Sequence, residues 1–340
     1  MNKTLKDVAR ELNMSISTIS RVVNNKDNVN EKTRDIVMAY LEKHKYTPNR
    51  VAKSLKENTT KTIGIIIPDI CEVLFGQIIK GIDQIVSQYD YSIILVDSHE
   101  DKHKEERCLE LLYEQRIDAL VLATVNSNGS KVLELINSGL AVVFIDNLPN
   151  LSVPYDAVLI DNTAASKMAI NHLLGQGHTQ IACIVGSTSE TTGGDRLLGY
   201  RLALEEAGIS VNENLIRVGN YKEDTGYSCM EELIRNRGGQ PFTAVYVAAE
   251  MMTFGAIKAI GSHGMSIPED ISVVGFDVHD RAGLMLPSIT TMRQDEQQIG
   301  KLVGELLMKR LSEREQAQGS PKQKILMMPF LEVKSSTKQI

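Results

Sequence analysis

The sequence predicts an α/β protein, in which a small all-α helix-turn-helix domain is followed by a two-lobed body with parallel sheets. Three observations support this fold class. The first part of the chain shows only helical periodicity. From Thr62 onward, strand-like apolar runs alternate with helical segments, as in parallel sheets covered by helices. This alternating part is about 270 residues long. That length is too great for a single sheet of ordinary size, so it indicates two lobes.

The N-terminal segment has the sharpest local pattern. Its apolar residues recur at i, i+3, i+4 and i+7, as on one face of a helix: Leu5, Val8, Ala9 and Leu12. Thr4 is a good N-cap, Asp7 favours the helix start, and Asn13 suits a left-handed helix end. A second short helix should begin at Ser15, and a third should span about 31–44. Two short helices joined by a tight turn predict a helix-turn-helix.

The body begins with the apolar run Ile63-Gly64-Ile65-Ile66-Ile67, which is typical of a parallel strand buried on both faces. We expect further strands near 91–97, 117–123, 140–146, 157–160, 180–185, 215–219, 242–248, 271–276 and 287–292. We expect helices near 73–89, 101–115, 129–138, 162–176, 195–207, 223–236, 251–263 and 295–312. The lobes should separate near Asp161, and a last strand pair near 324–333 should let the chain cross back between them.

Charge is unevenly distributed. The whole chain carries a net charge of −6, but residues 1–61 hold 13 Lys and Arg against 7 Asp and Glu, whereas the remainder has a net charge of −12. A basic N-terminal segment on an acidic body is an electrostatic footprint for phosphate, although a chance cluster of solvated charges would look the same.

Several classes are disfavoured by composition. The four cysteines are far apart and form no C-x-x-C pair, which predicts buried reduced thiols and no metal site. No run of 18 apolar residues predicts a membrane span, and the N-terminus lacks a secretory signal, so we expect a cytoplasmic protein. The chain lacks the nucleotide, hydrolase and metalloprotease motifs of common enzymes, so we expect no enzyme and no cofactor.

Short motifs at characteristic spacings occur in the N-terminal part of the chain, the head, and in the remainder, the body. In the head they are Leu5-Lys6-Asp7-Val8-Ala9-Arg10, Ser15-x-x-Thr18-Ile19-Ser20-Arg21-Val22-Val23-Asn24, Val29-Asn30-Glu31-Lys32-Thr33-Arg34 and Tyr46-x-Pro48-Asn49-x-x-Ala52-x-Ser54-Leu55. In the body they are Ile63-Gly64-Ile65-Ile66-Ile67-Pro68-Asp69, His172-Leu173-Leu174-x-x-Gly177-His178, Arg196-x-x-Gly199-Tyr200, Val273-Val274-Gly275-Phe276-Asp277 and Pro287-Ser288-Ile289-Thr290-Thr291. Over almost its whole length the chain resembles the lactose repressor (LacI/GalR) family of bacterial transcription regulators.

The resemblance implies three parts. Residues 1–47 would be a helix-turn-helix DNA-binding domain, and 48–61 a hinge helix with a linker. Residues 62–340 would form an effector-binding and dimerisation body like a type I periplasmic sugar-binding protein. Its N-terminal lobe would span about 62–160 and 292–322, and its C-terminal lobe about 161–291 and 323–335.

The resemblance also implies how such a chain would bind double-stranded DNA. The second helix would enter the major groove, where Ile16, Ser17 and Arg21 would read bases; Arg21 can bind guanine bidentately. Phosphate contacts would come from Thr4, Ser15, Thr18, Asn24, Asn28, Thr33 and Arg34. Other roles stay open for these residues. Ile16 could be a core residue, and Arg21 a solvated or phosphate-bound cation. Each predicted phosphate contact could instead be a helix cap or a surface residue.

The implied hinge helix would insert into the minor groove of a palindromic operator bound by a homodimer. Leu55 matches the wedging leucine of the family and Ala52 the small residue beside it; Asn49 and Lys53 would also contact the groove. An ordinary linker is the alternative reading. No C-terminal heptad segment is evident, which favours a dimer over a tetramer.

The implied effector cleft would lie at the carboxyl ends of strands, with the effector a sugar or sugar derivative. Four residues fit this place: Asp69, Asp146, Arg196 and Asp277. Phe75 is a further candidate, as an aromatic contact for a sugar ring, with a core residue as its alternative role. An interlobe salt bridge or a helix cap is the alternative role for Arg196 and Asp277. The chain departs from the usual motifs at Glu72, Ala249-Glu250 and Val278, which we interpret as a loss of polar partners. An effector that is less polar, phosphorylated or absent therefore stays open, as does control by a phosphocarrier protein.

The resemblance implies repression as the default role. Two other classes of protein are alternatives to a regulator. A sugar-binding transport protein would suit the body, but it would carry a secretory signal and no helix-turn-helix. An architectural DNA binder would leave the large body unexplained.

Overall fold

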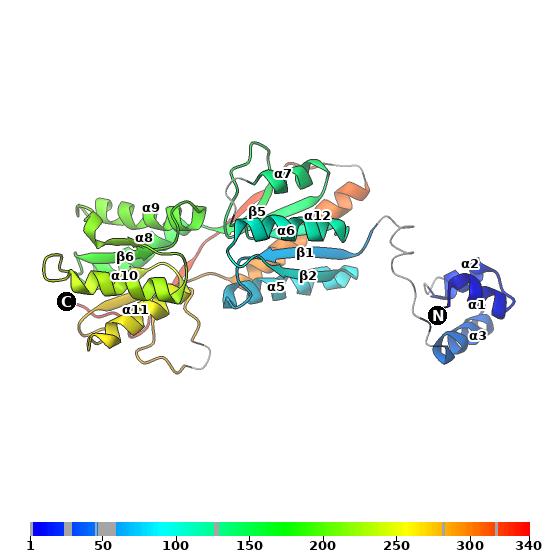
Figure 1. Cartoon of the computed structure of the whole chain (residues 1–340), viewed down its shortest axis with the longest axis horizontal. Helices are drawn as coiled ribbons and strands as arrows, with labels where there is room; N and C mark the ends of the chain where they lie inside the picture. The colour runs from blue at the N-terminus through cyan, green and yellow to red at the C-terminus, as the bar shows by residue number, and fades with distance from the viewer. Residues whose placement is uncertain are drawn as a thin grey trace. The chain divides into compact units, whose positions relative to one another are not determined.

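The computed structural model describes residues 3–23, 29–44, 46, 59–125, 129–280, 283–316 and 319–340. The chain divides into two compact units, Met1–Thr60 and Lys61–Ile340, which we call the head and the body and describe separately. Figure 1 colours the chain from blue at the N-terminus to red at the C-terminus.

In its described residues the head contains three helices, α1 (Leu5–Glu11), α2 (Ile16–Val23) and α3 (Glu31–Lys43). Thr4 caps α1 in a capping box: the amide of Asp7 donates to Thr4 Oγ1, and the amide of Thr4 donates to Asp7 Oδ2. The turn after α1 has Asn13 at φ 51°, in the left-handed region that asparagine tolerates. The head core consists of Val8, Ala9, Ile19, Val22 and Val37. The predicted helix-turn-helix is confirmed.

The body contains two six-stranded sheets. The first has the order β11-β5-β4-β3-β1-β2, formed by β1 (Thr62–Ile67), β2 (Ser92–Asp97), β3 (Ala119–Leu122), β4 (Ala141–Ile145), β5 (Asp156–Ile160) and β11 (Lys324–Met327). The second has the order β12-β10-β9-β8-β6-β7, formed by β6 (Ile181–Val185), β7 (Ile216–Val218), β8 (Ala244–Val247), β9 (Ser272–Phe276), β10 (Thr290–Arg293) and β12 (Phe330–Glu332). All neighbouring strands are parallel except β10 and β12.

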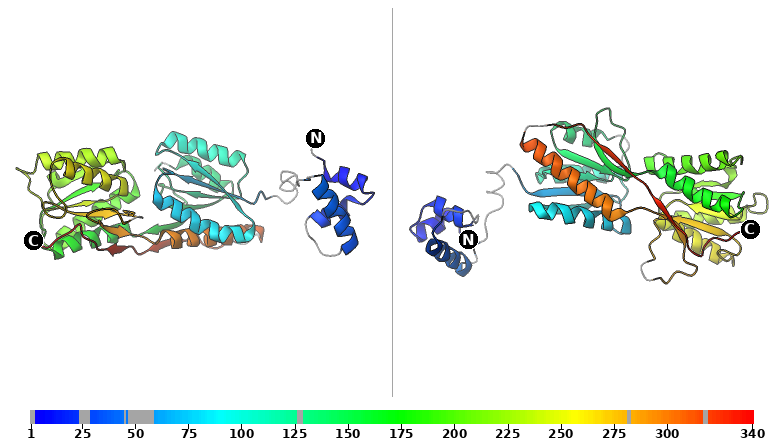
Figure 2. Two further views of the ribbon diagram at one scale, coloured as in Figure 1. Left: turned by 90° about the horizontal axis from the view of Figure 1, so that it is seen from below. Right: turned by 180° about the vertical axis from the view of Figure 1, so that it is seen from behind.

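Helices cover both sheets (Figures 1 and 2). The first lobe has α5 (Val73–Val86), α6 (Lys102–Glu114), α7 (Ser130–Asn137) and α12 (Glu296–Glu315), with the 3₁₀ turn η1 (Ser87–Tyr89). The second lobe has α8 (Asn162–Gly175), α9 (Thr191–Glu206), α10 (Glu223–Arg235) and α11 (Glu250–Ser262), with η2 (Glu213–Leu215). The predicted α/β fold class is thereby confirmed.

Close packing of α12 on α5 depends on glycine. A Cβ on Gly300 would meet the carbonyl of Ile78, and one on Gly81 would meet the carbonyl of Gln297. Backbone atoms cannot move aside as a flexible side chain can, so a side chain at either position would push the two helices apart.

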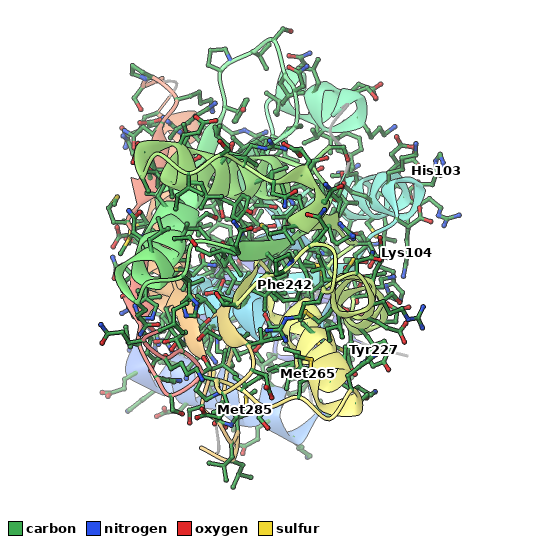
Figure 3. The ribbon with its side chains drawn as sticks, turned by 90° about the vertical axis from the view of Figure 1, so that its left-hand side faces the viewer. His103, Lys104, Tyr227, Phe242, Met265 and Met285 are labelled. Carbon is green, nitrogen blue, oxygen red and sulfur yellow. The ribbon has the colours of Figure 1, made fainter. Side chains whose placement is uncertain are left out.

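The largest apolar core cluster of the body contains residues of both lobes, and each lobe has a further cluster of its own. In the second lobe, Phe242 lies in a core cluster against which Tyr227, Met265 and Met285 pack (Figure 3). The interior strands of both sheets are buried along most of their length, as expected for parallel strands covered on both faces.

The chain crosses between the lobes at three places: between β5 and α8, between β10 and α12, and between β11 and β12. We expected the last crossing at 323, but the structure places it after Met327. The reason is that Lys324–Met327 pairs in parallel with β5 and so extends the first sheet. Likewise, we expected the chain to re-enter the first lobe at 292. Met292 and Arg293 instead belong to β10 in the second sheet.

Candidate functional site

The second helix of the head presents a polar face. Ile19 and Val22 are buried in the head core, whereas Ile16, Ser17 and Arg21 are exposed. Ile16 is 47% exposed, so it does not take part in the core. Among the residues that the structure describes, none forms an ion pair with Arg21. The three predicted base-reading side chains therefore lie on one helix, free of the core.

Some of the predicted phosphate contacts have local roles. Thr4 caps α1, and Ser15 Oγ accepts from the amide of Thr18 at 3.1 Å at the start of α2. Thr33 and Arg34 lie half-buried in the first turn of α3. The other predicted DNA contacts fall outside the described residues: Asn24, Asn28, Asn49, Ala52, Lys53 and Leu55.

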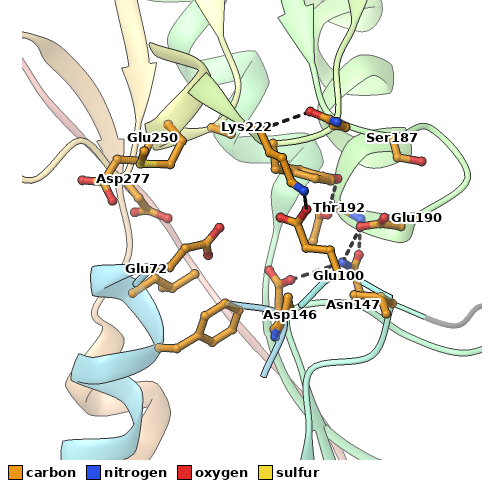
Figure 4. A pocket seen from close by; sticks show the side chains of 18 of the residues that line it. Glu72, Glu100, Asp146, Asn147, Ser187, Glu190, Thr192, Lys222, Glu250 and Asp277 are labelled. Carbon is orange, nitrogen blue, oxygen red and sulfur yellow. Dashed lines mark hydrogen bonds and ion pairs between the residues drawn. The ribbon is translucent and has the colours of Figure 1, made fainter. Parts of the chain in front are cut away.

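The body contains a cavity of about 390 Å³ between its two lobes (Figure 4). First-lobe residues in its lining follow β1, β2, β3 and β4, and second-lobe residues follow β6, β7, β8 and β9. In both sheets the strand order reverses beside the first strand of the lobe, at β1 and at β6. Such a switch point leaves a crevice at the carboxyl ends of parallel strands, where ligands bind in open α/β sheets.

The structure brings four of the five predicted effector residues together in this cavity: Phe75, Asp146, Arg196 and Asp277. Asp69 is not among its lining residues; its Oδ1 instead accepts from the amide of Cys71 at 2.8 Å in the turn after β1. The sequence signal for Asp69, an acid after a strand, did not distinguish a turn cap from a cavity residue.

Arg196 is held firmly. We expected it to open a helix at 195, but α9 begins at Thr191, so Arg196 lies in its second turn. Its Nε donates to Asn162 Oδ1 at 2.7 Å and its Nη1 donates to the carbonyl of Ala248 at 2.8 Å. The guanidinium carbon lies 3.6 Å from the ring centroid of Phe276. These contacts orient the guanidinium at the edge of the cavity.

Asp146 and Asp277 occupy equivalent positions in the two lobes. Each comes directly after the strand that is third in its sheet, β4 or β9, and each has a left-handed φ, 60° and 52°. Burial raises the pKa of Asp146, although the charge of Arg196 opposes the rise. Burial likewise raises the pKa of Asp277 to about 6. Aspartate tolerates the left-handed conformation, which lets each strand end turn abruptly into the cavity edge.

Sequence reasoning missed most of the acids in the cavity. Besides Asp146 and Asp277, the lining contains Glu72, Glu100, Asp101, Glu190 and Glu250. We interpreted the departures at Glu72 and at Ala249-Glu250 as a loss of polar partners, and the structure corrects this interpretation, because both glutamates line the cavity. Their position at the start of the helices that follow β1 and β8 was the available signal.

The lobes are joined across the cavity by polar contacts. Asn147 of the first lobe donates from Nδ2 to Glu190 Oε2 at 2.9 Å and accepts at Oδ1 from the amide of Thr192 at 3.0 Å. Lys222 of the second lobe lies 3.3 Å from Glu100 of the first. The cavity is therefore bounded by groups that meet only when the lobes are close together.

Within the described residues, no helix is long and apolar enough to cross a membrane, and no group of three or more His, Cys, Asp or Glu side chains could hold a metal ion.

Two family models match the chain. Residues 4–49 match the model described as "Bacterial regulatory proteins, lacI family", and residues 60–330 match "Periplasmic binding proteins and sugar binding domain of LacI family". Together they cover both the head and the body.

Known proteins agree over nearly the full length. The chain is 36% identical to the HTH-type transcriptional regulator RegA of Clostridium saccharobutylicum over 93% of this chain and 94% of that protein. It is 32% identical to the catabolite control protein A of Priestia megaterium over 99% and 100%. The solved lac repressor dimer bound to operator and the anti-inducer ONPF superposes with a TM-score of 0.85 at 26% identity, covering 99% and 100%. This chain belongs to the LacI family of DNA-binding transcriptional regulators, in which a helix-turn-helix domain precedes an effector-binding domain.

Proposed function

We propose that this regulator is a repressor that binds a palindromic operator as a homodimer and that a sugar or sugar derivative in the interlobe cavity changes its DNA affinity. The observation that carries the proposal is the combination, in one chain, of an exposed polar face on α2 with a polar cavity between two lobes. The solved lac repressor with a similar fold is a dimer with operator and a small molecule. Such a regulator acts where the DNA is, in the cytoplasm.

In this proposal residues 1–47 bind DNA, 48–61 form the hinge and 62–340 form the effector-binding and dimerisation body. Ile16, Ser17 and Arg21 read bases in the major groove. Phosphates are bound by Thr4, Ser15, Thr18, Asn24, Asn28, Thr33 and Arg34. In the minor groove, Leu55 wedges between base steps, with Asn49, Ala52 and Lys53 beside it.

The body supplies the switch. Phe75, Asp146, Arg196 and Asp277 contact the effector from both lobes, with Asp69 in a supporting turn. A ligand that binds the closed lobes more tightly than the open ones shifts the protein toward the closed state. Its effect on the free energy of DNA binding can be no larger than the difference between its binding free energies for the two states.

Fluorescence anisotropy tests the proposal. The full chain is titrated onto a pool of palindromic operators with a central CG step at two salt concentrations, with and without a panel of sugars and sugar derivatives. We expect one operator to bind by about three orders of magnitude more tightly than random DNA, and one compound to shift this affinity about tenfold. Equal binding to palindromic and random DNA would show that the assignment of Ile16, Ser17, Arg21 and Leu55 is wrong.

The same titration distinguishes a second kind of control. If one operator is preferred and no small molecule changes the affinity, the switch is a protein partner. A phosphocarrier protein docking on the body is then the candidate, and adding it to the titration in phosphorylated and unphosphorylated forms tests it.

A further inference from the structure

The interlobe cavity is strongly acidic. Among the residues that the structure describes, its lining contains seven carboxylates but only two permanent cations, Arg196 and Lys222. Three of the acids are already engaged. Glu100 lies beside Lys222, Asp101 accepts two backbone amides as the N-cap of α6, and Glu250 Oε1 lies 3.0 Å from a ring nitrogen of His279.

His279 is a cation in this setting. Burial lowers its pKa, but its ring also contacts Glu296 at 3.1 Å, and the hydrogen bonds to the two glutamates outweigh burial and raise the pKa to about 9. The charge of Glu250 is therefore compensated without any ligand.

Four acids remain: Glu72, Asp146, Glu190 and Asp277. Of the described cations that line the cavity, only Arg196 remains to compensate them, and no described residue forms an ion pair with any of the four. Asp146 and Glu190 accept hydrogen bonds from the neutral amide of Asn147. Figure 4 shows the four side chains around the cavity, two from each lobe.

Asp277 carries the most direct sign of a missing partner. It is only 6% exposed, and its Oδ2 accepts from Gln294 Nε2 at 2.5 Å. Its other oxygen, Oδ1, is buried and has no hydrogen-bond partner among the described residues. An unsatisfied buried carboxylate oxygen is costly, and a ligand donor that reached Oδ1 of this cavity-lining residue would remove that cost.

The chemistry of such a donor follows from its surroundings. The acids are not gathered closely enough to hold a metal ion, at least within the described residues. A phosphorylated ligand would lie among more acids than cations, and Arg196 already donates to Asn162 and Ala248. The cavity, at about 390 Å³, has the size of a site for a small organic molecule.

We propose that the ligand of this cavity is a small organic cation, whose ammonium group donates to Asp277 and whose positive charge is compensated by the surrounding carboxylates of Glu72, Asp146 and Glu190. An amino sugar satisfies both this proposal and the proposed function, on which the effector role of the ligand rests. Charge-assisted hydrogen bonds from an ammonium group to carboxylates are stronger than those from a hydroxyl group.

Proton release follows from this proposal. Burial and the nearby charge of Asp146 raise the pKa of Glu72 to about 8 and that of Glu190 to about 7. Both glutamates are therefore largely or partly protonated in the empty cavity at pH 7. A bound ammonium group stabilises the ionised carboxylates, so they lose protons when it binds. The other titratable groups lining the cavity are His99, Glu100, Asp101, Tyr221, Lys222 and Glu250, and Arg293 and Glu296 act on Asp277 from outside it.

Calorimetry with matched probes tests the proposal on the full chain at pH 7. The pairs are glucosamine with glucose, galactosamine with galactose, and putrescine with 1,4-butanediol, with glucose 6-phosphate as an anion. Each titration is run in phosphate and in HEPES, whose ionisation enthalpies differ; Tris is avoided because it is a primary amine like the probes, whereas HEPES has only tertiary amines and a sulfonate.

We expect at least one amine to bind about tenfold or more tightly than its hydroxyl partner, with a buffer-dependent enthalpy that reports release of about one proton. Asp277→Asn, Glu72→Gln and Glu190→Gln should each weaken amine binding. Glu205→Gln, on the exposed face of α9, is the matched control and should leave it unchanged. Thermal unfolding verifies that each variant is folded.

Two results would overturn the proposal: a neutral or phosphorylated probe binding as tightly as any amine, or no amine binding at all. Because these titrations contain no DNA, they are independent of the regulator function. An amine that binds but leaves operator affinity unchanged would support the ligand class and contradict the proposed switch.

Discussion

The side-chain amide of Asn147 in the first lobe donates to the carboxylate of Glu190 in the second lobe at 2.9 Å. The same amide accepts from Thr191 Oγ1 at 3.1 Å and from the backbone of Thr192 at 3.0 Å, and it is only 4% exposed. One buried side chain thus joins the end of β4 to the first turn of α9. A contact that exists only while the lobes are together is a natural element of a two-state switch.

Replacing Asn147 should therefore favour the open lobes. Asn147→Ala removes several interlobe hydrogen bonds, each with a net contribution of about 1 kcal/mol, so effector affinity should fall by about tenfold or more. Calorimetry with the tightest-binding probe measures this. Asn137→Ala, at the exposed end of α7, is the control. Equal affinity in both variants would show that Asn147 does not contribute to closure.

Glu72 should make stability depend on pH. Its pKa is raised from 4.5 to about 8 in the folded protein, mainly by burial. Between these two pKa values, the folded state holds a proton that the unfolded state has lost. The free energy of unfolding should therefore fall as the pH rises from 4.5 to about 8. Glu72→Gln should remove this component and increase the free energy of unfolding at pH 8 by about 1–2 kcal/mol, less than the full shift implies because the side chain is partly solvated. Urea unfolding from pH 4 to 9 measures it, with Glu205→Gln as control; parallel profiles for Glu72→Gln and wild type would contradict it.

The ion pair between Arg310 on α12 and Asp156 on β5 is buried. Arg310 Nε and Nη2 donate to the two oxygens of Asp156 at 2.8 and 2.6 Å, and Asp156 is fully buried. Arg310→Met leaves that carboxylate with Lys322 as its remaining cation, so the free energy of unfolding should fall by about 3–5 kcal/mol. Urea unfolding measures this loss.

The control is a surface pair of the same type. Arg201→Met removes the partner of Glu213 on the surface of the second lobe. Water screens that pair, so the loss should be much smaller. Similar losses for Arg310→Met and Arg201→Met would refute a special role for the buried pair.

Arg21 should determine base preference. If it contacts guanine, Arg21→Ala should weaken binding to the preferred operator by about 1–3 kcal/mol and relax selectivity at one base pair, with little effect on random DNA. Anisotropy against single-base operator variants measures this. Arg235→Ala, at the exposed end of α10, is the control. A uniform loss over all sequences would instead indicate a phosphate contact.

Leu55 should be needed for DNA bending. A side chain wedged between base steps costs unstacking energy, which the additional protein–DNA contacts of the bent duplex offset. Leu55→Ala should therefore lower operator affinity and reduce the bend. Energy transfer between dyes at the operator ends measures the bend. Leu284→Ala, at a site that is 79% exposed in the body, is the control. An unchanged bend in Leu55→Ala would show that residues 49–56 act as a plain linker.

Local patterns were enough for most of the fold. The helices of the head followed from apolar spacing and from the Thr4 cap, and the strands of the body followed from continuous apolar runs, because these signals depend on near neighbours in sequence. The start of α9 was missed because Thr191, Thr192 and two glycines are poor helix formers. Their helix is stabilised by contacts with Asn147, which lies more than forty residues away.

By itself, the sequence determined the family, the order of head and body, the two parallel sheets and the candidate residues at strand ends, since all of these depend on local periodicity and short motifs. Only the tertiary structure decided which acids share one cavity, which of them have partners, and that Asp69 caps a turn instead. The physical reason is that charge compensation and burial depend on distances between atoms of different lobes. Those distances are set by how the two sheets pack and by the three crossings between them, and no local pattern in the chain encodes them.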